Sequence, residues 1–158
     1  MTVGQSRLFF KLVGNTDVGR LVSYIEMEFQ GPQNTPKLQQ AFVQFKGFTL
    51  GQAWSTFGDM TAVPTTIDEE GPSSGIEIRQ PMLRYTYHIN DRWQSSLALE
   101  YAKASYTTGK NAESIRQKVP DIPLNIRYTM KNGSHVQVGA ILRNISYKNV
   151  VKDKDKIR

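Results

Sequence analysis

The sequence predicts an all-β fold, an antiparallel up-and-down transmembrane β-barrel. Three observations predict it: apolar and polar residues alternate with period two within each segment, short and long connections alternate along the chain, and aromatic residues gather on the apolar face. No stretch approaches the ~20 consecutive apolar residues that a membrane-spanning helix requires. A chain of this kind crosses a membrane with strands.

Eight segments carry the alternation, and each is expected to form one strand. In chain order they are residues 6 to 13, 18 to 30, 38 to 46, 48 to 57, 79 to 89, 93 to 105, 123 to 130 and 134 to 147. Most of these lengths suit the ~9–11 tilted residues that span a bilayer. Strands of soluble proteins are more often ~5–6 residues long.

The connections between these segments alternate in length. Short turns are expected at 14–17, 46–47, 90–92 and 131–133, the last an Asn-Gly hairpin turn. Longer loops are expected at 31–37, 58–78 and 106–122, and the charged residues 152–156 would open another. Outer-membrane barrels have short turns at one rim and long loops at the other.

Each segment has one apolar and one polar face, as in a soluble β-sandwich. Aromatic placement favours a lipid-facing surface, because several aromatic residues near strand ends lie on the apolar face, as in interfacial girdles. They are Phe29, Tyr85, Tyr87, Trp93, Tyr101 and Tyr128. Two alternatives stay open: a soluble β-barrel binding protein, and a small closed eight-stranded barrel that conducts nothing.

Composition argues against enzymes and metal sites. The chain has no cysteine, which excludes disulfides, thiolate metal sites and cysteine nucleophiles. His88 and His135 are expected on opposite sides of the predicted strands, and neither has a nucleophile motif beside it. No enzyme activity, cofactor or metal site is expected. The net charge of +6 permits nucleic-acid binding, but the arginines and the aromatic residues are expected on opposite faces, which argues against it.

Residues 50–59 read Leu-Gly-Gln-Ala-Trp-Ser-Thr-Phe-Gly-Asp, and the chain continues through Glu70-Gly71-Pro72 to Arg79-Gln80-Pro81. This segment resembles the DcaP-like family of outer-membrane porins. In that family a strand ending in Gly-Gln-x-Trp-Ser-Thr-Phe precedes a loop with an acidic Glu-Gly-Pro, and Arg-Gln-Pro opens the next strand. The resemblance covers most of residues 6 to 148 and is most specific over 50–85.

The resemblance implies a sixteen-stranded homotrimeric barrel, surrounded by lipid of the Gram-negative outer membrane. Such a porin passes small hydrophilic solutes by passive diffusion, with a preference for anions such as dicarboxylates. With eight strands, residues 1–158 would be a single, incomplete barrel domain that lacks the C-terminal half. One N-terminal strand is also expected to be missing, because the inward-folding loop of sixteen-stranded porins follows the fifth strand, and here the candidate follows the fourth.

In a wide barrel every second residue faces water and can set solute selectivity. The pore-lining candidates for selectivity are Arg20, Arg79, Arg84, Arg127, Arg143, Glu26, Glu28 and Glu100, and Arg7, Lys11 and Lys46 are also expected to point inward. The excess of basic residues favours anionic solutes. In the other interpretation, the arginines pair with the glutamates as a wall network and touch no solute.

The loop from Thr61 to Ser74 carries three adjacent acids, Asp68, Glu69 and Glu70, between Pro64 and Pro72. The resemblance implies that this loop folds into the lumen and constricts it opposite the arginines. The alternative is a solvent-exposed surface loop. The three acids alone are weak evidence for a divalent-cation site, since they supply few of the oxygen ligands that such a site needs.

Overall fold

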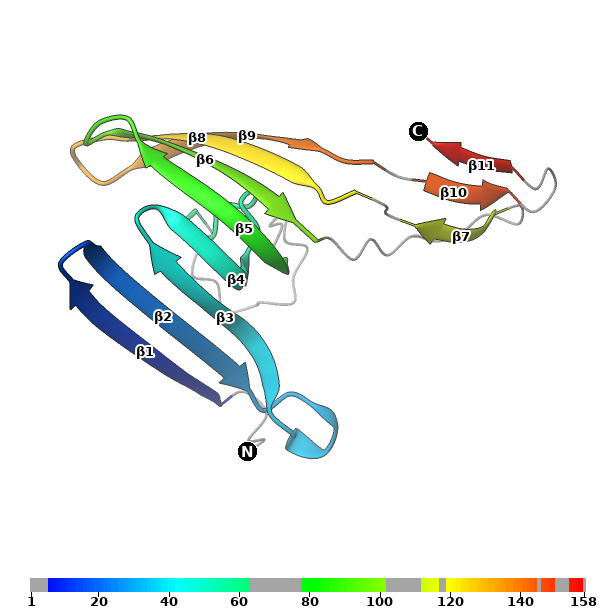
Figure 1. Ribbon diagram of the computed structural model, residues 1–158, viewed down its shortest axis with the longest axis horizontal. Helices are drawn as coiled ribbons and strands as arrows, with labels where there is room; N and C mark the ends of the chain where they lie inside the picture. The colour runs from blue at the N-terminus through cyan, green and yellow to red at the C-terminus, as the bar shows by residue number, and fades with distance from the viewer. Residues whose placement is uncertain are drawn as a thin grey trace.

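A computed structural model describes residues 6–62, 78–101, 112–116, 119–144, 146–149 and 154–157. Eight strands form one antiparallel sheet in which each strand pairs with the next one along the chain (Figure 1). They are β1 (Arg7–Thr16), β2 (Gly19–Glu28), β3 (Lys37–Phe45), β4 (Phe48–Trp54), β5 (Arg79–His88), β6 (Trp93–Glu100), β8 (Ile122–Thr129) and β9 (His135–Leu142). This arrangement confirms the predicted up-and-down topology.

The strand boundaries differ from the predicted ones in places. Strand β1 continues to Thr16, because Asn15 pairs with Arg20 and Thr16 with Gly19, so the first turn contains only two residues. Strands β6 and β9 end earlier than predicted. A second sheet, in the order β11-β10-β7, consists of β7 (Ala112–Arg116), β10 (Ser146–Asn149) and β11 (Lys154–Ile157). These short strands were not predicted from the alternation pattern.

Helical structure is confined to a short stretch in the part of the chain that the structure describes. The 3-10 turn Pro32–Asn34 lies in the connection between β2 and β3. Within the described residues, no helix has the length and apolarity needed to cross a membrane.

Strand pairing sorts the side chains of the large sheet onto two faces. One row of paired residues runs across β1 to β6 on the inner face: Lys11, Tyr24, Phe42, Gly51, Met82 and Glu100. The neighbouring row lies on the outer face: Leu12, Ser23, Val43, Leu50, Leu83 and Leu99. The outer row is largely apolar, as the period-two pattern predicts.

Burial is inverted relative to a water-soluble protein. Outer side chains such as Leu50 (63% exposed), Val138 (71%) and Leu142 (71%) are open to the surroundings. Apart from Pro123, the buried apolar side chains among the described residues are Ala53, Met82 and Ala98. The buried polar ones include Glu26, Glu28, Gln39, Thr49, Gln80, Ser96, Glu100, Asp121 and Asn125. An apolar outer face around a polar inner face is the arrangement of a membrane barrel.

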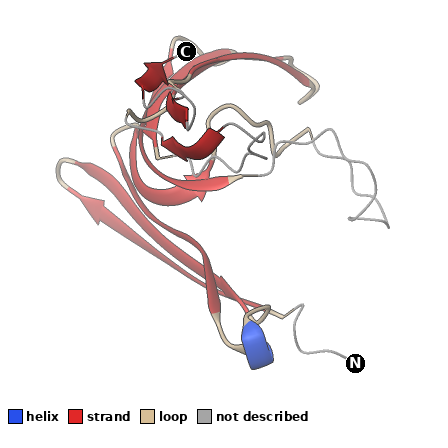
Figure 2. Cartoon of the chain, turned by 90° about the vertical axis from the view of Figure 1, so that its right-hand side faces the viewer, coloured by secondary structure: helices blue, strands red, loops and turns tan. Residues whose placement is uncertain are grey.

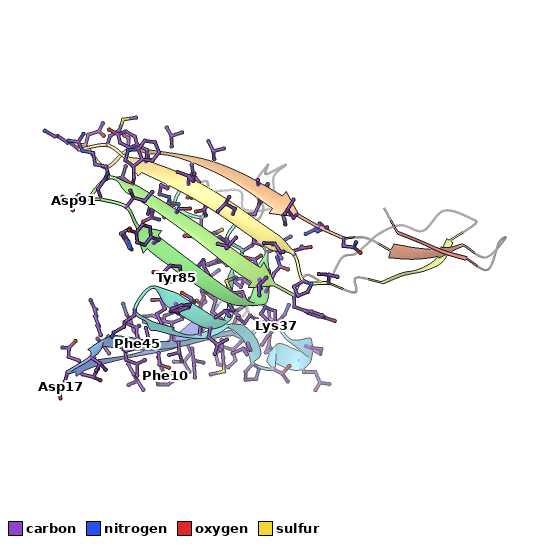
Figure 3. The ribbon with its side chains drawn as sticks, turned by 45° about the horizontal axis from the view of Figure 1, so that its top comes forward. Phe10, Asp17, Lys37, Phe45, Tyr85 and Asp91 are labelled. Carbon is purple, nitrogen blue, oxygen red and sulfur yellow. The ribbon has the colours of Figure 1, made fainter. Side chains whose placement is uncertain are left out.

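Aromatic pairs mark the outer face near the short turns. The ring centroids of Phe48 and Tyr85 are 4.7 Å apart, and those of Trp93 and Tyr128 are 4.8 Å apart. Figure 3 labels Asp17 and Asp91 in two of the short turns at one end of the sheet, with Lys37 towards the other end. Aromatic residues at such a rim are typical of an interfacial girdle.

The sheet is curved and open (Figure 2). Strands β1 and β9 form its two edges and do not pair with each other within the described residues. The structure therefore does not have the closed eight-stranded barrel that the sequence left open as an alternative.

The pairing of β3 with β4 depends on Gly51, which has φ of +129°. A Cβ at this position would lie 2.2 Å from the carbonyl oxygen of Ala41 and 2.7 Å from the Cα of Phe42. We therefore expect Gly51→Ala to destabilise the folded chain by about 1–3 kcal/mol, measured by urea unfolding in detergent micelles. Gly14→Ala is the matched control, because no atom lies within 4 Å of its Cβ position. Equal stability of the two variants would contradict this expectation.

Candidate functional site

The inner face of the large sheet is the candidate site, because most of the predicted pore-lining residues lie there. Arg84, Arg127, Glu26, Glu28 and Glu100 project from it. Arg20 lies near its short-turn end, at the start of β2, whereas Arg79 and Arg143 lie at the ends of strands near the long loops. Asp68, Glu69 and Glu70 lie outside the described residues.

Glu100 anchors the beginning of the loop that follows β4. The hydroxyl of Ser55 donates to Oε2 of Glu100 at 2.7 Å, and the backbone N–H of Thr56 donates to Oε1 at 2.7 Å. The amide of Gln80 donates to Oε2 at 3.1 Å. Since Glu100 is fully buried, these donors compensate for the loss of its hydration.

The end of β4 and the first residues after it are held against β5, β8 and β9. The side-chain amide of Asn125 donates to the carbonyl oxygen of Thr56 at 2.6 Å, and Nη1 of Arg84 lies 3.5 Å from the carbonyl oxygen of Trp54. The ring of Phe57 lies over Gly139, 3.5 Å from where a Cβ would stand. Residues 55–62, called here the anchor segment, therefore begin on the inner face of the sheet.

Asp59 attaches the anchor segment to the far strands. Its Oδ1 accepts from Nη2 of Arg127 at 2.6 Å, and its Oδ2 lies 2.7 Å from Nε2 of His135. The hydroxyl of Thr61 also donates to Oδ1 at 2.6 Å. Burial raises the pKa of Asp59, but the hydrogen bonds from Thr61 and His135 and the charge of Arg127 outweigh it and hold the pKa below its ordinary value.

Both histidines lie on the inner face, so the expectation that they lie on opposite sides is wrong. His88 pairs with Gln94, which pairs with Arg127, and His135 lies one row further on, opposite Thr129. His135 is close to a hydroxyl and a carboxylate, but Thr61 and Asp59 approach the same ring nitrogen, Nε2. A hydrolytic triad requires the nucleophile and the acid on opposite nitrogens of the ring.

Arg143 forms the second strong ion pair of this region. Its Nε and Nη2 donate to the carboxylate of Asp121 at 2.9 and 2.5 Å. Asp121 is fully buried, and its backbone pairs with Glu100 in an isolated bridge. Asp59 and Asp121 are not among the pore-lining residues predicted from the sequence. Each lies in a connection next to a strand, and the alternation pattern that predicts inward residues does not extend into the connections.

Glu26 and Glu28 form a separate cluster near the long-loop ends of β1 to β3. Nε of Arg7 lies 2.7 Å from Glu28, and the side-chain amide of Gln39 donates to the same carboxylate at 2.5 Å. Glu26 accepts from the amide of Gln40 at 2.7 Å and from the hydroxyl of Tyr24 at 2.9 Å. Both glutamates therefore have partners within the wall, and Oε1 of Glu28 has an ion pair with Arg7 but no hydrogen bond.

Arg79 lies at the start of β5, opposite Trp54, and its guanidinium carbon is 3.7 Å from the centroid of the Trp54 ring. Its Nη1 donates to the side chain of Gln39 at 2.6 Å, and Gln39 in turn bonds to Glu28. Arg79 thus links the aromatic surface of Trp54 to the glutamate cluster.

Aromatic residues also occupy the inner face, which corrects the expectation that arginines and aromatics lie on opposite faces. Phe9 stacks on Tyr24 with ring centroids 6.1 Å apart, and Tyr24 stacks on Phe42 at 5.2 Å. The parity of Arg20, Tyr24 and Glu26 within one strand could have indicated part of this arrangement. The stacking of Phe9 from β1 and Phe42 from β3 on Tyr24 depends on the register between the strands, which the sequence pattern does not give.

Two of three comparisons with known proteins are consistent with this architecture. A family model described as the porin subfamily matches residues 3–155. The crystal structure of the outer membrane channel DcaP of Acinetobacter baumannii superposes with a TM-score of 0.85 and 20% sequence identity. The superposition covers 99% of this chain and 45% of that one, so the chain spans less than half of the channel's length. No curated protein matched the sequence.

The Asp59 contacts make a prediction about stability and its pH dependence. We expect Asp59→Asn to lower the free energy of unfolding by about 1–3 kcal/mol at pH 7, because Arg127 and His135 lose their charged partner. The pKa of Asp59 is lowered by folding, so this contribution is complete above the unfolded pKa of roughly 4 and is lost as pH falls through the lower folded value.

Urea titrations of the two proteins at pH 7 and in acid measure this difference. Asp91→Asn is the matched control, since Asp91 is exposed in a short turn. A difference between wild type and Asp59→Asn that grows on acidification would contradict the assignment.

Proposed function

The chain belongs to the porin subfamily of the Gram-negative outer membrane, and from this premise we propose that it forms part of the wall of a water-filled pore. Its activity in this proposal is passive diffusion of small hydrophilic solutes, preferentially anions such as dicarboxylates, without a catalytic step. The observation that carries the proposal is the inverted burial, with Leu50 and Val138 exposed on the outer face and Glu26, Glu28 and Glu100 buried on the inner one.

The barrel in this proposal is a single domain to which residues 1–158 contribute eight strands. Additional strands would pair with the open edges, β1 and β9, because an unpaired edge exposes backbone N–H and C=O groups that lipid cannot satisfy. The 45% of the DcaP channel that the superposition covers leaves room for such additional strands. Assembly as a homotrimer is part of the same proposal and follows from the family resemblance.

The loop after β4 is proposed to constrict the pore. Its first residues, the anchor segment, lie against the inner face through Glu100 and Asp59, so the chain enters the loop from the lumen side. Residues 61–74 would then extend into the lumen with Asp68, Glu69 and Glu70 facing the opposite wall. An acidic loop across from basic wall residues would create a transverse field that orients dipolar solutes.

Contact with lipid predicts a position-specific effect of charge. Leu97 pairs with Leu124 on the outer face near the middle of the sheet and is 52% exposed. We expect Leu97→Arg to destabilise the protein in lipid bilayers by about 2–4 kcal/mol, because a guanidinium near the bilayer midplane loses hydration. Gln44→Arg on the inner face is the control and should change stability much less. A fold that tolerates both arginines equally would exclude lipid contact at Leu97.

Conductance in planar bilayers tests the proposed function directly. We expect single-channel current steps from residues 1–158 extended by the additional strands that close the barrel, and none from residues 1–158 alone, since an open sheet does not enclose a pore. A folded, detergent-soluble extended protein that gives no steps would rule out the channel proposal.

A further inference from the structure

Most basic residues of the inner face fall into two groups; Arg84, which is half-buried with Nη1 3.5 Å from the carbonyl oxygen of Trp54, belongs to neither. In the first group each guanidinium has a carboxylate partner: Arg7 with Glu28, Arg127 with Asp59, and Arg143 with Asp121. In the second group, Lys11, Arg20 and Lys46 have no carboxylate partner in the described part of the chain. The charge of the first group is largely neutralised within the wall, whereas that of the second group is open to solutes.

The second group converges on one groove. An open depression of about 580 Å³ on the inner face, called here the rim groove, lies beside the short turns between β1 and β2 and between β3 and β4. Its lining residues are Lys11, Arg20, Val22, Tyr24, Phe42, Gln44, Phe45, Lys46, Gly47, Phe48, Thr49, Thr86 and His88. The lining includes three cationic side chains, hydroxyl and amide donors, and no carboxylate.

The turn between β3 and β4 holds Lys46 toward the groove. Lys46 and Gly47 adopt positive φ angles of 46° and 84°, which allows β3 to reverse into β4 within two residues. The Cε of Lys46 lies 3.5 Å from the Cβ position of Gly19, and its Nζ lies 5.5 Å from the centroid of the Phe45 ring. The ammonium group therefore lies near the start of β2, close to Arg20, which also lines the groove.

We propose that the rim groove binds small anions that carry carboxylate or phosphate groups, and that it supplies the main anion attraction of the pore. This inference rests on the proposed function and assigns the anion preference of the pore to one place on its wall. The sequence alone does not distinguish the groove cations from the arginines that are paired with acids. Three unneutralised cations in one concave site raise the local concentration of anions. The guanidinium of Arg20 can bind a carboxylate with two parallel hydrogen bonds, and the lysines act as point charges.

The hydroxyls and amide of the groove complete the site. Thr49 and Thr86 lie on the adjacent strands β4 and β5. The side-chain amide of Gln44 donates to the hydroxyl of Thr49 at 3.3 Å. Thr86 shares a 3.0 Å hydrogen bond with Ser96. Tyr24 and Phe42 provide apolar contact for the carbon skeleton of an organic anion. An organic carboxylate thus finds more complementary surface here than an inorganic ion does.

Equilibrium binding to the 158-residue chain in detergent micelles tests the inference. The probes are succinate and inorganic phosphate, titrated at low ionic strength by isothermal calorimetry, and the variant is Lys11→Gln/Arg20→Gln/Lys46→Gln. We expect saturable binding by the wild type and at least about a tenfold loss of affinity in the variant. The matched control Lys37→Gln/Arg92→Gln/Lys131→Gln removes the same charge from exposed residues outside the groove and should bind within about twofold of wild type.

Three results would overturn the inference: no saturable binding of either probe by the folded wild type, undiminished binding by the groove variant, or an equal loss in the control. Far-UV circular dichroism checks that each variant is folded, and Arg20→Gln alone replaces the triple variant if that fails to fold. Because binding does not require conduction, saturable binding in a protein that never conducts would refute the channel proposal while supporting the groove. Conduction without binding that depends on the groove residues would support the channel proposal and refute the groove inference.

Discussion

The structure depends on the requirement that the outer face of the sheet contact lipid while every backbone polar group is paired. Antiparallel pairing from β1 to β9 satisfies the backbone groups between neighbouring strands, and apolar side chains such as Leu50, Leu83 and Leu99 cover one face. Polar residues are then restricted to the other face by the period of two. The inverted burial, the length of the strands and the aromatic pairs near the short turns all follow from this requirement.

A polar inner face must also satisfy its own charges, and it does so with a network that positions the loop after β4. Glu100 receives hydrogen bonds from Ser55, Thr56 and Gln80, while Asp59 joins Arg127 and His135. Removing one partner from such a network leaves a charge with little hydration, which gives these contacts more effect on stability than exposed ion pairs have. The same interactions that neutralise the wall direct the anchor segment across the inner face.

This network changes which basic residues are available to solutes. The sequence indicates a uniform set of inward cations, but Arg127 and Arg143 bind aspartates in the wall, and Arg7 binds Glu28. These arginines therefore pair with acids of the wall, although most of the acids are not the glutamates that were expected. Apart from Arg84, which lies beside the carbonyl oxygen of Trp54, the other cations, Lys11, Arg20 and Lys46, line one groove at the short-turn rim.

The sequence by itself determined the all-β class, the eight strands of the large sheet, their two faces and the short turns, because period-two alternation and turn chemistry are local properties of the chain. Only the tertiary structure decided how inner residues combine. Asp59 meets His135 76 positions away, and Phe9, Tyr24 and Phe42 stack across three strands. Such contacts depend on cross-strand register and on the path of a loop, which local patterns do not contain.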